Sequence, residues 1–131
     1  MKRHLKISAI AMAAAALVGL TTPSIAQQGK LSGDSVKIGV LTDMSGVYAD
    51  YGGPGAVAAA KLAVQDFGGK MFGKPIEVVN ADHQNKPDIA KNVTQQWFDR
   101  DGVDMTVENL NSAVALTVQG LAKEKNKIAI V

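Results

Sequence analysis

The sequence predicts an α/β fold in which a parallel sheet is flanked by helices, and three observations support this prediction. Short apolar runs of strand length alternate with longer segments whose apolar residues recur at helical spacing. The segments between them are short and polar, as is typical of right-handed crossovers between parallel strands. The predicted order over residues 36–131 is strand-helix-strand-helix-strand-helix-strand.

The first strand, loop and helix begin with the stretch VKIGVLTDMSGVYADYGGPG at residues 36–55. Residues 36–41 are apolar at nearly every position, which favours a strand covered on both faces. In residues 56–67 the apolar side chains recur at helical spacing. Gly68 and Gly69 then end this helix, because glycine readily adopts the left-handed turn by which a chain leaves a helix.

The middle of the chain predicts a turn, a second strand and a second helix. The turn covers residues 71–75, and the strand IEVVNA covers residues 76–81. Pro87 is placed where a helix tolerates proline, in its first turn. Apolar residues spaced by four form one stripe on this helix, which ends near Gly102, and Trp97 on that stripe is predicted to lie in the core.

The last part predicts a weaker third strand at residues 103–107 and a polar loop at residues 109–112. Ser112 is the expected N-cap of the third helix, because its hydroxyl can accept a hydrogen bond from a free helical N–H group. The lysines at residues 123–127 suit the negative end of this helix. A fourth strand is predicted at residues 128–131.

Residues 1–26 have the three parts of a secretory signal peptide. A basic start precedes an Ala-rich apolar run, and the pattern Ser24-Ile25-Ala26 suits cleavage after Ala26. The alternative of an uncleaved membrane anchor is disfavoured, because the apolar run is short for a membrane span. Residues 27–35 then form a polar N-terminal tail, and a periplasmic location is expected.

Charge and cysteine content exclude several classes of protein. Three of the 14 basic residues lie in the signal peptide, which leaves 11 basic against 12 acidic residues. Nucleic acid is therefore not an expected partner, since binding a phosphate backbone needs a clustered basic surface. The chain has no cysteine, so it has neither disulfides nor a lipid-modifiable Cys.

Three polar loops are expected at one edge of the sheet, where ligands of open α/β sheets bind. The free N–H groups at helix starts on this edge favour anions such as carboxylates. Tyr48 and Tyr51 lie close together in the first loop and are candidates for an aromatic wall. The third loop offers Asn111 and Ser112, beside the expected start of the third helix.

Other features of these loops have less specific interpretations. The glycines of residues 52–55 lack the Lys-Ser/Thr of a phosphate loop, so they serve either a close ligand approach or a tight turn before the helix. Asp82 and His83 are expected on a surface loop and not in a metal site, since no cysteine and no other histidine follows the signal peptide. Ser112 has no candidate His partner, so no catalytic nucleophile is predicted.

The stretch at residues 36–55, together with FGGKMFGKPIEVVNADHQNKPDIA and NSAVALTVQGLAKEKNKI, resembles periplasmic solute-binding proteins of ABC transporters. The resemblance covers residues 36–131 and is nearest to the leucine/isoleucine/valine-binding type, especially its branch for aromatic and related acids. It implies the first part of lobe 1 of a two-lobed type I periplasmic binding fold that closes on its ligand. The second lobe and its contacts would lie beyond the sequence.

The resemblance also implies specific ligand contacts. Tyr51 matches the tyrosine that lines the ligand in the family, and Ser112 matches the serine that holds the ligand carboxylate with nearby backbone amides such as that of Ala113. Amino-acid binders of this type often carry a second hydroxyl residue at the position of Ala113. The alanine therefore fits an acid with less polar surroundings.

The predicted function is to capture a small organic acid, either a branched-chain amino acid or an aromatic carboxylate, for a membrane permease. This role needs no cofactor and no catalytic residue, and a monomer suffices. One alternative is an exported α/β hydrolase-like enzyme in which Asp43, Asp82 and His83 meet at the strand edge. Another is an inactive product of a truncated gene, because the sequence stops on the apolar end of a strand at Val131.

Overall fold

The computed structural model describes Leu31 and residues 33–131, so the predicted signal peptide and most of the predicted tail lie outside the described residues. Strands and helices alternate along the described chain, as predicted, with one additional short strand. The elements are β1 (Val36–Thr42), α1 (Gly53–Asp66), β2 (Lys70–Met71), β3 (Lys74–Asp82), α2 (Pro87–Gln96), η1 (Trp97–Asp101), β4 (Met105–Val107), α3 (Ser112–Glu124) and β5 (Ile128–Ala129).

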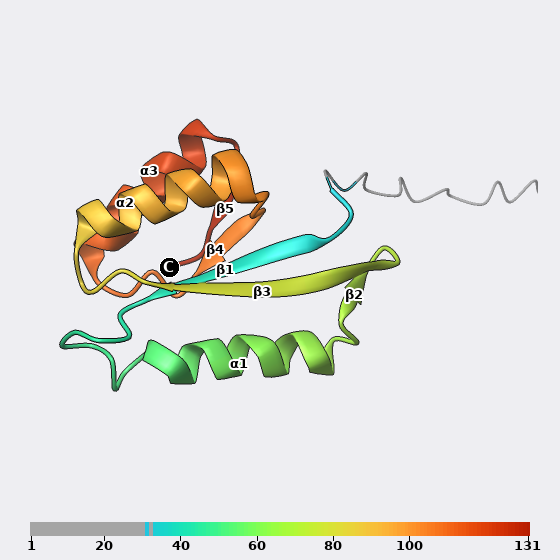
Figure 1. Ribbon diagram of the computed structural model, residues 1–131, viewed down its shortest axis with the longest axis horizontal. Coiled ribbons are helices and arrows are strands. Elements are labelled where there is room, and N and C mark those ends of the chain that lie inside the picture. Colours follow the sequence, from blue (N-terminus) through green and yellow to red (C-terminus); the bar gives the residue numbers. More distant parts are fainter. Residues whose placement is uncertain (1–30, 32) are drawn as a thin grey trace, which may run out of the picture.

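The five strands form one sheet in the order β2-β3-β1-β4-β5. β1 pairs in parallel with β3 and β4, and β4 pairs in parallel with β5. Figure 1 shows α2 and α3 on one face of this sheet and α1 on the other. The predicted α/β class is therefore confirmed. Among the described residues, no helix is both long and apolar enough to cross a membrane.

The predicted turn at residues 71–75 is confirmed only at Phe72 and Gly73, because the residues on both sides of it belong to the strands of a β-hairpin. β2 runs antiparallel to the start of β3 and pairs Lys70 with Pro75. Only Phe72 and Gly73 connect the two strands, and both have positive φ, at 50° and 80°. Two-residue hairpin loops with positive φ at both positions match the twist of their strands, which explains why so short a connection suffices.

The last two strands are shorter than predicted. Val103 lies before β4, and its N–H donates to the carbonyl of Trp97 at 3.0 Å, so it closes the π-helical turn η1 and does not join the sheet. β5 covers only Ile128–Ala129, although the N–H of Ile130 still donates to the carbonyl of Thr106 at 2.9 Å.

The hydrophobic core lies between the sheet and the pair α2 and α3. Trp97 is 7% exposed, which confirms its predicted place in the core. Its ring lies over Gly39 of β1, where an added Cβ would approach a ring carbon to 2.5 Å. The buried members of this core are Leu41, Ala90, Trp97, Phe98, Val103, Val114, Val118 and Ala122.

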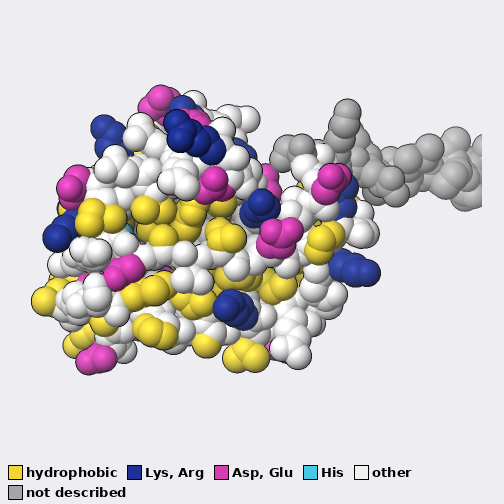
Figure 2. Space-filling model, viewed as in Figure 1, with side chains coloured by type: hydrophobic (Ala, Val, Ile, Leu, Met, Phe, Trp, Pro, Cys, Tyr) yellow, Lys and Arg dark blue, Asp and Glu magenta, His cyan; other side chains and the backbone are white. Residues whose placement is uncertain are grey.

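The face under α1 is less well covered. Within α1 only Gly53 and Val57 are buried, and Phe67, just after the helix, is 64% exposed. A cavity of about 370 Å³ lies between α1 and the sheet and is lined by apolar side chains. Figure 2 shows hydrophobic side chains gathered across the middle of the visible face, where the sheet lies between α1 and the two helices above it.

Candidate functional site

The three polar loops that follow the parallel strands meet at one edge of the sheet, as predicted, on the left of Figure 1. The first loop is residues 43–52 between β1 and α1, and the second loop is residues 83–86 between β3 and α2. The third loop is residues 108–111 between β4 and α3. We call this the carboxyl edge, because the carboxyl ends of β1, β3 and β4 form it.

Asp43 organises the first loop from inside. Its side chain is fully buried, and its carboxylate accepts hydrogen bonds from the N–H groups of Gly46 at 2.7 Å and Tyr48 at 3.0 Å. A buried carboxylate must be compensated in this way, because leaving it unpaired would be costly. Asp43 therefore fixes the path of the loop.

Asp82, the last residue of β3, joins the first and second loops. Its carboxylate accepts from the N–H of Met44 at 2.9 Å, the hydroxyl of Ser45 at 2.6 Å and the N–H of Gln84 at 2.7 Å. Partial burial raises the pKa of Asp82, but the hydrogen bonds from Ser45, Met44 and Gln84 outweigh it, so the pKa lies below its usual value of 3.8. Asp82 is therefore anionic near neutral pH.

His83 begins the second loop but is not at the surface, so its expected surface position is wrong. Its side chain is fully buried, and its Nδ1 accepts the N–H of Asn85 at 3.0 Å. Its Nε2 is also buried, and no partner for it exists among the described residues. Burial lowers the pKa of His83 below 6.5, against the opposing effect of the Asp43 and Asp82 carboxylates.

The first and third loops touch at Gly52. A Cβ added there would lie 2.8 Å from Oγ1 of Thr42 and 2.9 Å from Oε1 of Glu108. Thr42 Oγ1 in turn accepts the N–H of Gly53, the first residue of α1, at 3.1 Å. These contacts favour the second of the two interpretations of residues 52–55, a tight turn and helix start, with close packing as the reason for glycine at position 52.

The N-cap of α3 is Asn111, whereas Ser112 had been expected to be the N-cap. Oδ1 of Asn111 accepts the N–H of Ala113 at 2.7 Å, and Ser112 is the first helical residue. Asn111 has a φ of 92°, a conformation that asparagine tolerates better than most residues. Its Nδ2 donates to Oδ1 of Asn85, which connects the third loop to the second.

The two tyrosines form a pair on the outer side of the first loop. Their ring centroids are 6.4 Å apart with an interplanar angle of 63°, the edge-to-face arrangement that aromatic rings prefer. Tyr48 is 38% exposed and Tyr51 is 84% exposed. The pair leaves most of the Tyr51 ring available to another surface, and the aromatic wall stays a prediction.

A cavity of about 380 Å³ opens at the third loop and the start of α3, within the size range of small-molecule sites. Asn111 and Ser112 line it, whereas Tyr48, Tyr51 and Ala113 do not. Sequence reasoning missed Leu110, Ala115 and Val131; the position of Ala115, one turn after Ser112 on the same helix, could have indicated it. The full lining is Glu108, Asn109, Leu110, Asn111, Ser112, Ala115 and Val131.

The first turn of α3 gives this cavity its chemistry. The first N–H groups of a helix have no intrahelical acceptor. Asn111 satisfies that of Ala113, and Val114 is fully buried, whereas Ser112 lines the cavity. The N–H group and the hydroxyl of Ser112, together with the positive end of the helix dipole, suit a carboxylate group.

The geometry argues against the enzyme alternative. Asp43 and Asp82 both accept several loop hydrogen bonds, and none of Asp43, Asp82 and His83 lines the 380 Å³ cavity. In the described part of the chain, no three His, Asp or Glu side chains are grouped so that they could hold a metal ion. A further cavity of about 410 Å³ lies on the outer side of α2 and η1, away from the carboxyl edge.

Comparison with known proteins gives one matching family, described as periplasmic binding protein, over residues 35–131. A search of curated proteins gives no match. Among solved structures, a periplasmic binding protein from Burkholderia mallei is similar at 58% identity and a TM-score of 0.71, over 73% of this chain and 26% of that one. A branched chain amino acid ABC transporter periplasmic ligand-binding protein from Burkholderia xenovorans is 52% identical with a TM-score of 0.70, over 72% and 25% of the two chains.

A third similar structure is a solute binding protein of an ABC transporter from Rhodopseudomonas palustris in complex with 3,4-dihydroxy benzoic acid. It is 27% identical with a TM-score of 0.68, over 75% of this chain and 27% of that one. This chain therefore spans about a quarter of the length of the solved proteins that it matches. Its fold is the type I periplasmic binding fold.

Proposed function

This chain belongs to the periplasmic binding protein family, and we propose that it is part of the substrate-binding component of an ABC importer. The component captures a small organic acid, either a branched-chain amino acid or an aromatic carboxylate, between two lobes. The described residues form part of the first lobe, and residues 1–26 are the export signal. The bound form is then presented, as a monomer, to a permease in the inner membrane.

The observation that supports a carboxylate ligand is the start of α3 at the 380 Å³ cavity. Ser112, the first residue of α3, lines this cavity with its N–H group and its hydroxyl at the start of the helix. Such a site binds anions without a lysine or arginine, because the unpaired N–H groups and the helix dipole supply the positive potential. The second lobe would provide the contacts that differ between open and closed states.

Two observations favour an aromatic acid over an amino acid. Ala113 provides no second hydroxyl at the helix start, and the exposed ring of Tyr51 offers an apolar wall on the first loop. The structural relatives point to both classes, since one is named as a branched chain amino acid ABC transporter periplasmic ligand-binding protein and another holds 3,4-dihydroxy benzoic acid. The aromatic class is therefore the first to be tested.

Calorimetric titration of the exported protein with 3,4-dihydroxybenzoate and with leucine tests the proposal. Replacement of Ser112 by Ala should weaken binding of the better ligand by roughly tenfold, because a hydrogen bond to a charged group is lost. Thr117→Ala is the matched control, since it removes a hydroxyl from the same helix whose partner is the carbonyl of Ala113. Equal affinities of the Ser112→Ala and Thr117→Ala variants would show that Ser112 does not hold the carboxylate.

Tyr51 separates the two ligand classes. Tyr51→Ala should weaken the binding of 3,4-dihydroxybenzoate by roughly tenfold and the binding of leucine by less. Stacking of the ring against an aromatic ligand stabilises a complex more than contact with an aliphatic ligand does. Tyr51→Phe keeps the ring and should bind both acids as the unchanged protein does. If the alanine variant lost affinity equally for both acids, the aromatic wall would have no role in selectivity.

A further inference from the structure

A chain of hydrogen bonds runs from the buried imidazole of His83 to the start of α3. Nδ1 of His83 accepts the N–H of Asn85 at 3.0 Å. Oδ1 of Asn85 accepts from Nδ2 of Asn111, and Oδ1 of Asn111 accepts the N–H of Ala113 at 2.7 Å. The imidazole is fully buried.

We propose that His83 is a positioning residue for the anion-binding end of α3. Through Asn85 and Asn111 its neutral imidazole sets the position of the first-turn N–H groups, and protonation of the ring releases them. The proposal rests on the proposed function, in which these groups receive the ligand carboxylate. His83 itself does not touch the ligand.

The protonation state matters because only a bare ring nitrogen can accept a hydrogen bond. With Nδ1 accepting, the neutral ring carries its proton on Nε2. A second proton would occupy Nδ1 and place one N–H group against another, that of Asn85. The contact would change from attraction to repulsion, and the second loop would have to move.

One backbone hydrogen bond closes the second loop, from the N–H of Lys86 to the carbonyl of His83 at 2.8 Å. Gln84 and Asn85 both have positive φ, at 51° and 56°, a conformation that is uncommon for residues other than glycine. The N–H of Gln84 is held by Asp82, and that of Asn85 by His83. Loss of the imidazole acceptor therefore leaves the N–H of Asn85 without its partner, and it is the side chain of Asn85 that is bonded to Asn111.

The charges around the ring define the pH range of this release. Asp43 from the first loop and Asp82 from the end of β3 stabilise the protonated ring, whereas burial destabilises it more strongly, so the pKa of His83 lies below 6.5. The unfolded chain therefore binds the proton more readily than the folded one. The neutral arrangement is complete above about pH 6.5 and is lost as the pH falls through the lower pKa of the folded chain.

Nuclear magnetic resonance of the labelled, ligand-free protein between about pH 8 and about pH 5 tests this proposal. The ring nitrogens of His83 report its protonation, and the exchange rate of the Ala113 amide reports the cap of α3. As the ring is protonated, Ala113 exchange corrected for pH should rise roughly fivefold, the equivalent of one hydrogen bond. In His83→Asn, whose side-chain oxygen can still accept the N–H of Asn85, the exchange rate of the Ala113 amide should stay constant with pH.

A second pair of variants tests the chain of hydrogen bonds if His83→Asn does not fold. Asn85→Gly keeps the positive φ but removes the link to Asn111, so Ala113 exchange should rise at every pH. Gln84→Gly is the matched control, because the exposed side chain of Gln84 has one hydrogen bond among the described residues, accepted from Nζ of Lys86 at 3.5 Å. Exchange should stay as in the unchanged protein.

Three outcomes would overturn the proposal. The exchange rate of the Ala113 amide could stay constant while the ring is protonated, or the ring could remain neutral over the whole pH range. Asn85→Gly could also give the same Ala113 exchange rate as Gln84→Gly. Failure of the proposed function looks different, since carboxylates would then not bind at any pH while the ligand-free response of Ala113 remained.

Discussion

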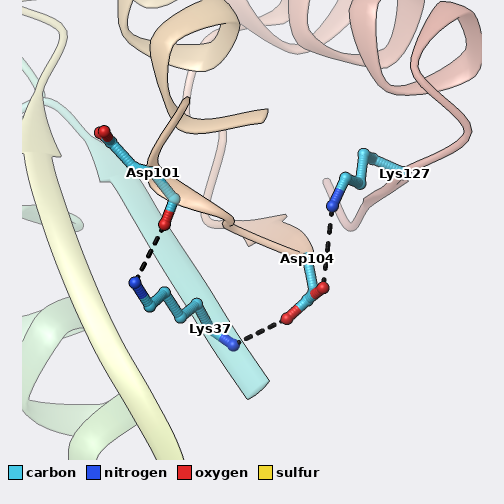
Figure 3. A network of polar contacts seen from close by, with 4 residues as sticks. All are labelled: Lys37, Asp101, Asp104 and Lys127. Carbon is cyan, nitrogen blue, oxygen red and sulfur yellow. Dashed lines mark hydrogen bonds and ion pairs between the residues drawn. The ribbon is translucent and has the colours of Figure 1, made fainter. Parts of the chain in front are cut away.

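The two ends of the sheet are both held together by aspartates, but the aspartates have different partners. At the amino end, Asp104 accepts the N–H of Lys37 at 2.9 Å and pairs with Nζ of Lys127 at 3.7 Å. Nζ of Lys37 donates to the carbonyl of Asp101 at 3.0 Å (Figure 3). At this end Asp104, just before β4, is therefore joined to β1 by a backbone N–H group and to Lys127, just before β5, by an ion pair.

At the carboxyl edge, no lysine or arginine is among the partners described for the aspartates. Asp43 and Asp82 accept only from backbone N–H groups and one hydroxyl. Lys86 belongs to the second loop, but its Nζ donates to Gln84 and it does not line the 380 Å³ cavity. The two carboxylates therefore shape the loops, and the start of α3 supplies the anion site.

Removal of the Asp43 side chain is the first test of this contrast between the two ends of the sheet, and it should have the largest effect on the free energy of unfolding. Asp43→Ala leaves the N–H groups of Gly46 and Tyr48 without their acceptor and should lower the free energy of unfolding by about 3 kcal/mol. Urea unfolding measures the change. Asp50→Ala, an exposed position on the same loop, is the control. Equal stability of the two variants would mean that Asp43 does not organise the loop.

The second way is to neutralise Asp82, with a smaller effect. Asp82→Asn keeps an oxygen for the N–H groups of Met44 and Gln84 and should cost about 1 kcal/mol at neutral pH. Glu77→Gln, an exposed position on the same strand, should change the free energy of unfolding little.

The pH dependence of stability sharpens the prediction for Asp82. The folded pKa lies below 3.8, so the stability that the ionised group contributes is present above that value and is lost as the pH falls through the folded pKa. Asp82→Asn should therefore approach the stability of the unchanged protein in acid. A difference that stayed constant from neutral pH into acid would contradict the lowered pKa.

The sequence predicted the parts of this molecule that depend on local pattern. Apolar runs and helical spacing placed the alternating elements, and Trp97 was assigned to the core from its place on one helical stripe. β2 was missed because two residues are too few to form a pattern, and its partner is set by the turn at Phe72 and Gly73.

The details of the carboxyl edge depend on contacts between distant residues, and these could not be predicted. His83 lies in a polar stretch that reads as a surface loop, yet tertiary packing around the end of β3 buries it. Asn111 and Ser112 are both good caps by type, and the choice of Asn111 goes with its link to Asn85, which is 26 residues away. The predicted ligand contacts of Tyr51 and Ser112 await measurement.

The third test of the contrast between the two ends changes the amino end of the sheet, and it should have the smallest effect on the free energy of unfolding. Lys127→Gln removes the ion pair with Asp104 while the bond from the Lys37 N–H remains, so the free energy of unfolding should fall by about 0.5 kcal/mol. Because this pair is partly exposed, the loss should shrink in high salt, whereas the loss in Asp43→Ala should not. Lys123→Gln, an exposed position in the last turn of α3, is the control. If salt reduced both losses equally, the two ends of the sheet would be stabilised by the same kind of interaction, and the contrast between a charge-paired end and a backbone-bonded end would fail.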